Sequence, residues 1–275
     1  DQRGDDALSV CFDGPALDAP LAMLGAAKLT LRLASDKPLA FIVARLCDVA
    51  PDGSSTRIAH GILNLCHRRN AEAPQPMLPG VPEDVVLVLD QMGYRVAVGH
   101  RLRLALSTTY WPFVWPSPEA ATLEITSASL DVPVHQGAGG AEWLPPPAET
   151  AAPWAHDVKR TGKSVRRIES DLIAGTHALV VEDDLGDTEN LTHGLVTGET
   201  TTERWEIGAD PLSARAEITW EQRLSRGDWR VRTRAETLMT ATTTHLRMQA
   251  SLTALEGETV VFRRDWDEEV ARDFV

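Results

Sequence analysis

Histidine and serine are the residue types of this chain that could do hydrolytic chemistry. A nucleophilic serine needs a histidine base and an acid beside it in hydrogen-bonding order. The 275-residue sequence has eight histidines, but they are dispersed singly without a repeated pattern of partners; they are His60, His67, His100, His135, His156, His177, His193 and His245. The G-x-S-x-G turn of α/β-type serine hydrolases is absent. We therefore interpret each histidine as a strand-surface or hydrogen-bonded core residue and assign no catalytic residue.

The serines of the PDGSS stretch belong to a predicted turn. Asp52 and Gly53 are residue types that tight turns require, and the serines that follow can cap the turn with their hydroxyl groups. We expect Asp52 and Gly53 to be structural, and we interpret these serines as capping residues.

Motifs that would hold a metal ion or a phosphate group are also missing. The sequence has no H-x-H, H-E-x-x-H or C-x-x-C motif. The acidic runs at 182–184 and 265–269 are consecutive, whereas a calcium loop spaces its carboxylates. The GAGGAE stretch at 137–142 lacks the G-x-G-x-x-G spacing and leads into prolines. We expect no metal and no cofactor, and we interpret the acidic runs as solvated strand edges.

The strongest local signal is the aromatic segment STTYWPFVWPSP, residues 107–118. It gathers four aromatic residues between prolines, in a chain with only 5% aromatic residues; they are Tyr110, Trp111, Phe113 and Trp115. Large rigid aromatic area on a stiff backbone suits recognition of another surface. The same residues could instead cap the end of the chain's own sandwich, and these two interpretations stay open. A sugar platform is a weaker third, since the neighbours in sequence are Pro, Val and Ser.

Composition excludes several classes of protein. The net charge is -13 and the pI is about 5.0, and proteins that bind nucleic acid need clustered uncompensated Lys and Arg. The only locally basic stretch, residues 159–167, is followed at once by Glu169 and Asp171. No apolar run approaches the roughly 18 to 20 residues of a membrane span. We expect a soluble protein without nucleic-acid or membrane partners.

The three cysteines predict small buried side chains. Cys11, Cys47 and Cys66 are widely separated and lie in apolar strand-like contexts, which fits neither a zinc site nor a disulfide framework. A reducing compartment follows, so we expect a cytoplasmic protein.

Hydrophobic residues alternate with period two almost throughout the chain. Leu29, Leu31 and Leu33 share one face of a predicted strand, as do Leu102, Leu104 and Leu106. The runs LAFIVARLCDV and IAHGILNLC are apolar on both faces, as expected of central strands. The pattern predicts an all-β protein, with one soft helix candidate in EEVARDFV at the C-terminus.

A change of composition predicts two domains. Gly, Ala and Pro dominate residues 135–153, and beyond residue 214 proline is absent. We expect a sandwich over residues 1–135, a linker or crossover over residues 136–155, and an antiparallel β-rich region over residues 156–275 that packs on or beside the sandwich. Turns at 225–228 and 256–258 are expected to separate three long strands of a meander with one wet face.

At this point the residues resemble a known family. The strings DALSVCFDGPALDAPLAMLGAAKLTLRLASDKP, RLCDVAPDGSSTRIAHGILNL and GHRLRLALSTTYWPFVWPS occur in order between Asp5 and Val134. They are similar to the C-terminal region of the CocE/NonD hydrolases, which include cocaine esterase, α-amino acid ester hydrolases and X-Pro dipeptidyl-peptidases. The tail resembles an extension of some bacterial members, in a pattern of Trp266, Glu268, Val270, Arg272 and Asp273.

The resemblance implies a jelly-roll sandwich, similar to galactose-binding domains, whose catalytic serine, aspartate and histidine lie in an upstream α/β-hydrolase domain. That domain would be the partner, and the expected role is to pack on it and wall its substrate cleft. The expected contacts are Tyr110, Trp111, Phe113 and Trp115; Asp52, Gly53 and His100 would hold a turn and a strand start. A carbohydrate-binding module is the alternative function, hydrolysis by this chain alone ranks far behind, and self-association is left open.

Overall fold

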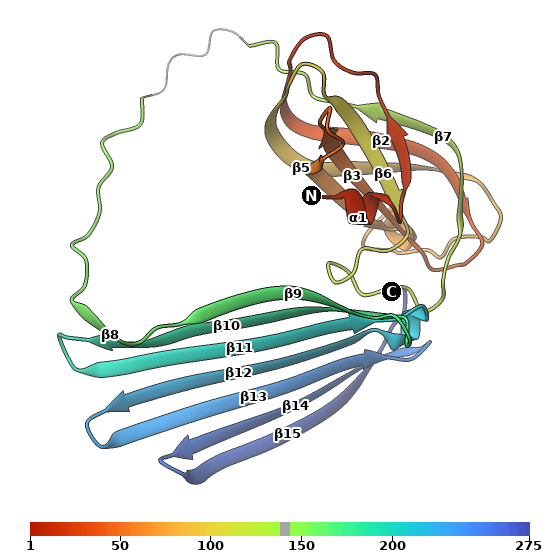
Figure 1. Cartoon of the computed structure of the whole chain (residues 1–275). Coiled ribbons are helices and arrows are strands. Elements are labelled where there is room, and N and C mark those ends of the chain that lie inside the picture. Colours follow the sequence, from red (N-terminus) through yellow and green to blue (C-terminus); the bar gives the residue numbers. More distant parts are fainter. Residues whose placement is uncertain (138–143) are drawn as a thin grey trace. The chain divides into compact units, whose positions relative to one another are not determined.

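The computed structural model describes residues 1–137 and 144–275, which form two compact units (Figure 1). Unit 1 comprises Asp1–Trp143 with Phe274–Val275, and unit 2 comprises Leu144–Asp273. Described helical structure is limited to three short turns: α1 (Arg3–Asp6), η1 (Leu65–His67) and η2 (Pro211–Ser213). The predicted all-β class is confirmed.

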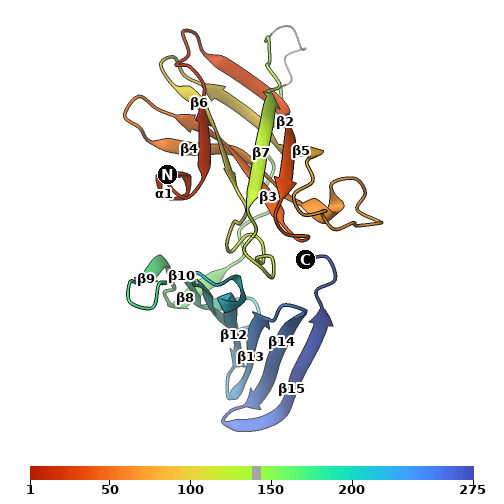
Figure 2. The ribbon, with the colours of Figure 1, turned by 90° about the vertical axis from the view of Figure 1, so that its right-hand side faces the viewer.

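Unit 1 is a sandwich of two antiparallel sheets that face each other across one core (Figure 2). The four-stranded sheet has the order β1-β6-β3-β4, and the three-stranded sheet has the order β5-β2-β7. The strands are β1 (Val10–Asp13), β2 (Leu21–Ser35), β3 (Phe41–Val49), β4 (Ser55–Asn64), β5 (Glu83–Val96), β6 (Arg101–Ser107) and β7 (Leu123–Asp131). This arrangement is consistent with the expected jelly roll.

The core of unit 1 follows the alternation of the sequence. Leu29, Leu31 and Leu33 of β2 are fully buried, and every residue of β3 is buried. β3 is therefore a central strand, as predicted. The same expectation for β4 is wrong, because β4 is the outer strand of its sheet and most of its residues are only half-buried. An apolar run cannot distinguish a central strand from an edge strand that packs against a strand of the other sheet.

The cysteines match their predicted character in part. Cys47 and Cys66 are buried, Cys11 is half-buried, and all three are free thiols. Burial raises the pKa of Cys47 to about 11, so this thiol is almost entirely protonated at neutral pH.

Unit 2 is a single antiparallel sheet in which the strands follow one another along the chain (Figure 1). The order is β15-β14-β13-β12-β11-β10-β8, and β9 also pairs with β10. The strands are β8 (His156–Arg160), β9 (Lys163–Asp171), β10 (Thr176–Asn190), β11 (Leu195–Ile207), β12 (Arg215–Arg226), β13 (Trp229–Ala241), β14 (His245–Glu256) and β15 (Thr259–Ala271). Residues 144–155 of the predicted linker carry no strand, and residues 138–143 lie outside the described part.

The register gathers large apolar side chains on one face of this sheet, here called the apolar face, although that face also carries Glu203, Arg264 and Glu268; the other is called the charged face. One row across the strands runs Trp205, Ala216, Met239 and Met248, and the next row on the same face includes Ile218 and Trp266. Rows on the other face carry Arg, Glu and Asp. Much of the apolar face is exposed, with Trp220 at 50% and Trp229 at 45%.

Two expectations for this region are wrong. Residues 214–275 form four long strands instead of three, because the chain also turns at residues 242–244, where β13 meets β14. Three threonines occupy that turn, and no glycine or proline marks it. The helix candidate at the C-terminus is instead the end of β15, where Glu268, Glu269 and Val270 pair with β14. Sheet pairing overrides the helix propensity of a short acidic run.

Two glycines make the corner between β8, β9 and β10 possible. A Cβ at Gly186 would lie 2.2 Å from the carbonyl oxygen of Arg160, and Gly186 has a φ of +76°. A Cβ at Gly162 would lie 2.2 Å from the carbonyl oxygen of Asp184. Backbone therefore approaches backbone at the bulge in β10, and no side chain fits between the strands.

We expect Gly186→Ala to lower the free energy of unfolding by more than about 2 kcal/mol, since it adds a backbone clash to a left-handed φ. Gly227→Ala is the matched control, because Gly227 has a φ of +59° with no atom within 4 Å of a built Cβ. This substitution should lower the free energy of unfolding by only about 1 kcal/mol. Urea unfolding followed by tryptophan fluorescence measures both variants. Equal decreases in their free energies of unfolding would contradict a backbone clash at position 186.

Ion pairs stabilise the charged face of the sheet. Arg160 binds both Asp184 and Asp187, with its Nε 2.5 Å from Asp187 Oδ2. The hydrogen bond from Arg160 lowers the pKa of Asp184 to about 2. Hydrogen bonds from Arg204, and then from Arg167, lower the pKa of Glu169. A carboxyl group whose pKa is lowered by folding stabilises the folded state only while it is ionised.

The sign of this linkage predicts acid sensitivity. The contribution of Asp184 is fully present above the ordinary Asp pKa of about 3.9, and it is lost as the pH falls through about 2. We expect Asp184→Asn to lower the melting temperature at pH 7 and to reduce its further decrease between pH values of about 5 and 2. Asp228→Asn is the control, because Asp228 is exposed and has no ion pair among the described residues. If the melting temperatures of wild type and Asp184→Asn decrease in parallel as the pH is lowered, the contribution of Asp184 to acid sensitivity is contradicted.

Candidate functional site

The aromatic segment leaves the sandwich at the end of β6 and folds into a turn. The amide of Val114 donates to the carbonyl oxygen of Tyr110 at 3.1 Å. This turn places the rings of Tyr110 and Phe113 in a parallel stack, with centroids 4.7 Å apart and an interplanar angle of 8°. Tyr110 is buried, whereas Phe113 is 59% exposed. The inner ring therefore belongs to the packing of unit 1, and the outer ring presents apolar area to the surroundings.

Side chains of β3 and β4 hold this stack. The guanidinium carbon of Arg57 lies 5.3 Å from the ring centroid of Phe113 and 5.9 Å from that of Tyr110. Arg57 also donates a hydrogen bond to the Tyr110 hydroxyl. Arg45, whose side chain is fully buried, lies 5.7 Å from the Tyr110 centroid on the same ring system. Cation–π contacts and a hydrogen bond thus fix both rings.

A histidine and an acid complete the surroundings of the exposed ring. His60 of β4 lies edge-on to Phe113, with centroids 5.6 Å apart. Its Nδ1 lies 2.7 Å from Oδ2 of Asp90 on β5. Sequence reasoning missed Arg57, His60 and Asp90 as members of a site. The only available signal was that Arg57 and His60 interrupt an otherwise apolar strand.

Trp111 and Trp115 form a separate pair. Their rings meet edge-to-face, with centroids 5.2 Å apart and an angle of 75°. Both are half-buried. The four predicted aromatic residues therefore make two pairs with different geometry instead of one continuous platform.

The expected turn and strand-start residues lie in local hydrogen-bond networks. Asp52 accepts hydrogen bonds from the backbone amide and the hydroxyl of Ser54, and these lower the pKa of Asp52. Gly53 occupies the left-handed region with a φ of +85°. His100 Nδ1 lies 2.7 Å from Asp48, whose other oxygen accepts from the Tyr94 hydroxyl at 3.0 Å. Burial, and then this hydrogen bond, raise the pKa of Tyr94.

Asp52 and His100 bond to Ser54 and Asp48 respectively, and among the described contacts neither reaches the rings of Tyr110 and Phe113.

Histidine pairs with acids or with hydroxyls, but no described histidine has both partners. His60 and His100 pair with Asp90 and Asp48, whereas the Oγ of Ser170 lies 2.9 Å from His177. A serine nucleophile needs the base and the acid in one chain of hydrogen bonds, and the described side chains do not supply that order. They also contain no group of three or more His, Cys, Asp or Glu placed to hold a metal ion.

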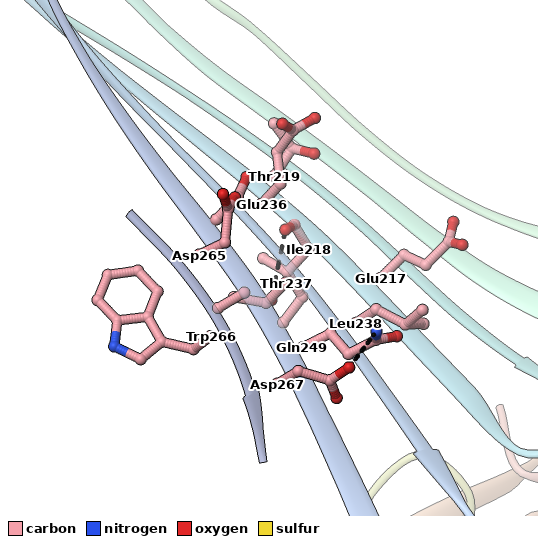
Figure 3. Close-up of a pocket in the computed structure, with 12 residues that line it drawn as sticks. Glu217, Ile218, Thr219, Glu236, Thr237, Leu238, Gln249, Asp265, Trp266 and Asp267 are labelled. Carbon is pink, nitrogen blue, oxygen red and sulfur yellow. Dashed lines mark hydrogen bonds between the residues drawn. The ribbon is translucent and has the colours of Figure 1, made fainter. Parts of the chain in front are cut away.

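One groove lies on the charged face of unit 2 and has a volume of about 690 Å³. Figure 3 shows Glu217, Glu236, Asp265 and Asp267 around it, with Trp266 pointing away. Each carboxylate already has an arginine partner: Arg215, Arg234, Arg263 and Arg247 respectively. The acidic lining is therefore compensated, and its arrangement indicates no cation or substrate site.

No described helix is long and apolar enough to span a membrane.

Comparisons with known proteins show what this chain is similar to. A sequence model described as the X-Pro dipeptidyl-peptidase C-terminal non-catalytic domain matches residues 1–163. An alpha-amino acid ester hydrolase structure is 20% identical, with a TM-score of 0.47 over 49% of this chain and 27% of its own. An aminopeptidase from a marine sediment Thaumarchaeota archaeon is 17% identical, with a TM-score of 0.47 over 50% of this chain and 27% of its own.

A CocE/NonD family hydrolase from Staphylococcus aureus is 16% identical, with a TM-score of 0.34 over 36% of this chain and 22% of its own. The chain thus spans about a quarter of the length of these solved structures. No curated protein matches it. The resemblance expected from the sequence is confirmed by the family match, which covers more than half of the chain: the protein belongs to the family of X-Pro dipeptidyl-peptidase C-terminal non-catalytic domains.

Proposed function

We propose that this chain is the non-catalytic C-terminal region of a serine hydrolase that cleaves esters or amides. In this proposal it packs on the catalytic α/β domain and forms one wall of the substrate cleft. A cleft between two domains buries more of a ligand than an open sheet edge does. A loop on a rigid sandwich can position such a wall at low entropic cost.

The exposed ring of Phe113 is the observation that carries the proposal. It is 59% exposed and lies flat on the buried ring of Tyr110. Arg57 holds both rings from one side. The ring therefore loses little freedom when another surface covers it, which is the property of an anchor residue at an interface.

The tryptophan pair extends this contact in our proposal. Trp111 and Trp115 lie in the same segment and brace each other edge-to-face. We assign Phe113 the direct contact, Tyr110 its support, and Trp111 with Trp115 the neighbouring contact. We also keep the division into residues 1–135, a linker over 136–155, and residues 156–275 as part of the proposal.

Mixing this chain with its cognate hydrolase domain tests the function. We expect association and a change in ester turnover. Phe113→Ala should weaken association about tenfold, since an anchor residue contributes more than about 1 kcal/mol, while the melting temperature of the chain alone should fall by only a few degrees, because the stack with Tyr110 is lost. Leu24→Ala is the matched control, because Leu24 is an apolar residue of β2 that is 62% exposed. Absence of association together with unchanged turnover would contradict the proposal.

A carbohydrate-binding module is the second candidate. The observation that favours it is the position of Arg57, His60 and Asp90 around the exposed ring of Phe113. Sugar sites combine a stacked aromatic ring with hydrogen-bonding side chains, although these three groups already bond within the chain.

Titration of tryptophan fluorescence with mono- and oligosaccharides tests this candidate. Under it we expect a saturable change that Phe113→Ala abolishes, because the stacking face is lost and Trp111 and Trp115 report from the same segment. Leu24→Ala should leave the change intact. A flat response to every sugar removes the candidate.

A further inference from the structure

The two sheets of unit 1 differ in width, and the mismatch lies on one side of the sandwich. On the closed side, β4 and β5 meet, and His60 and Asp90 pair between them. On the open side, β1 and β7 are the outer strands of their sheets. Four strands therefore face three, and β1 extends past β7 by one strand, a width of about 4.8 Å.

Apolar side chains of β1 are left uncovered by this mismatch. Val10 and Phe12 pair with Leu106 and Leu104, so all four point to the core side of their sheet. The two leucines are buried, but Val10 is 59% exposed and Phe12 is 49% exposed. Facing sheets lie about 10 Å apart, so a strand beside β7 would lie directly opposite these side chains.

Two grooves mark the empty position. One, of about 460 Å³, lies between Phe12, Leu104 and β7 residues from Ile125 to Leu130. The other, of about 510 Å³, lies between Val10, Leu106 and the start of β7. Their floor is apolar, and one wall is the edge of β7, which pairs with no described strand except β2. An unpaired sheet edge offers backbone donors and acceptors to an extended chain.

We propose that the edge of β7 accepts a single extended strand that completes the three-stranded sheet and covers Val10 and Phe12. The occupant is an extended segment of the hydrolase partner, and this source rests on the proposed function. Its inward residues would be apolar. Its outward residues would be basic, because Glu124 and Asp131 are exposed acidic residues of β7.

A second copy of the chain does not fit this position. Symmetric pairing of two β7 edges would bring the second copy's four-stranded sheet along with its β7. That sheet overhangs its own β7 in the same way. Both β1 strands would then occupy the same layer above the paired edges, which steric overlap forbids.

The outer edge of unit 2 is a poorer acceptor. β15 carries Arg263, Asp265, Asp267, Glu268 and Glu269 on its two faces. Charges along an edge discourage pairing with another strand.

Peptide binding followed by amide hydrogen exchange tests the proposal on the intact chain. The probe is an acetylated peptide of the length of β7, nine residues, in which lysine and valine alternate. We expect it to slow the exchange of amides in residues 123–131. A peptide that alternates glutamate and valine should bind about tenfold more weakly, owing to repulsion from Glu124 and Asp131.

Phe12→Ser should weaken binding of the lysine peptide about tenfold, because it removes apolar area from the groove. Val86→Ser is the control, since Val86 is an exposed residue of β5, and it should leave binding unchanged.

Three outcomes would each overturn the proposal: neither peptide protects the β7 amides from exchange, protection is confined to unit 2, or a concentration-dependent dimer protects β7. If Phe12→Ser fails to fold, the comparison of the two peptides still decides. Because these readouts use no hydrolase, they can fail or succeed independently of the turnover test.

Discussion

Burying one face of each sheet is the constraint on which this structure depends. Alternation gives strands such as β2 and β5 one apolar face, and water must be kept from that face by another layer. Unit 1 solves the problem internally, since its two sheets bury Leu29, Leu31 and Ile42 completely between them. Unit 2 is one sheet with an apolar face on which Trp220 and Trp229 are about half exposed.

The charged face of the same sheet needs no such cover. Its arginines and acids pair along and across the strands, as in the contacts of Arg167 with Glu169 and Glu182. Exposed pairs of this kind contribute little stability each. They do satisfy the charged groups of a surface that stays in water, and they leave the acidic groove without an uncompensated charge. The two faces therefore have different physical roles, although they alternate residue by residue.

The sequence predicted what depends on local periodicity. The period of two was enough for the all-β class and for the burial of β3 and of Leu29, Leu31 and Leu33. It could not predict sheet order, so β4 was expected in the centre of its sheet. It also missed the turn at residues 242–244, where threonines replace the usual turn residues. Of the candidate site, the sequence pointed to the aromatic residues as a prediction, whereas Arg57, His60 and Asp90 meet Phe113 only through long-range pairing of β4 with its neighbours.

The aromatic segment shows why capping and docking were hard to separate from sequence. Thr108 and Thr109 line the groove at the open side of the sandwich, whereas Tyr110 and Phe113 contact His60 at the closed side. The segment thus crosses one end of unit 1, and a crossing segment must bury some residues against the core. Tyr110 is buried there, and the turn closed by Val114 then lifts the next ring outward onto it. The stack therefore places the ring of Tyr110 inside unit 1 and leaves the ring of Phe113 at its surface.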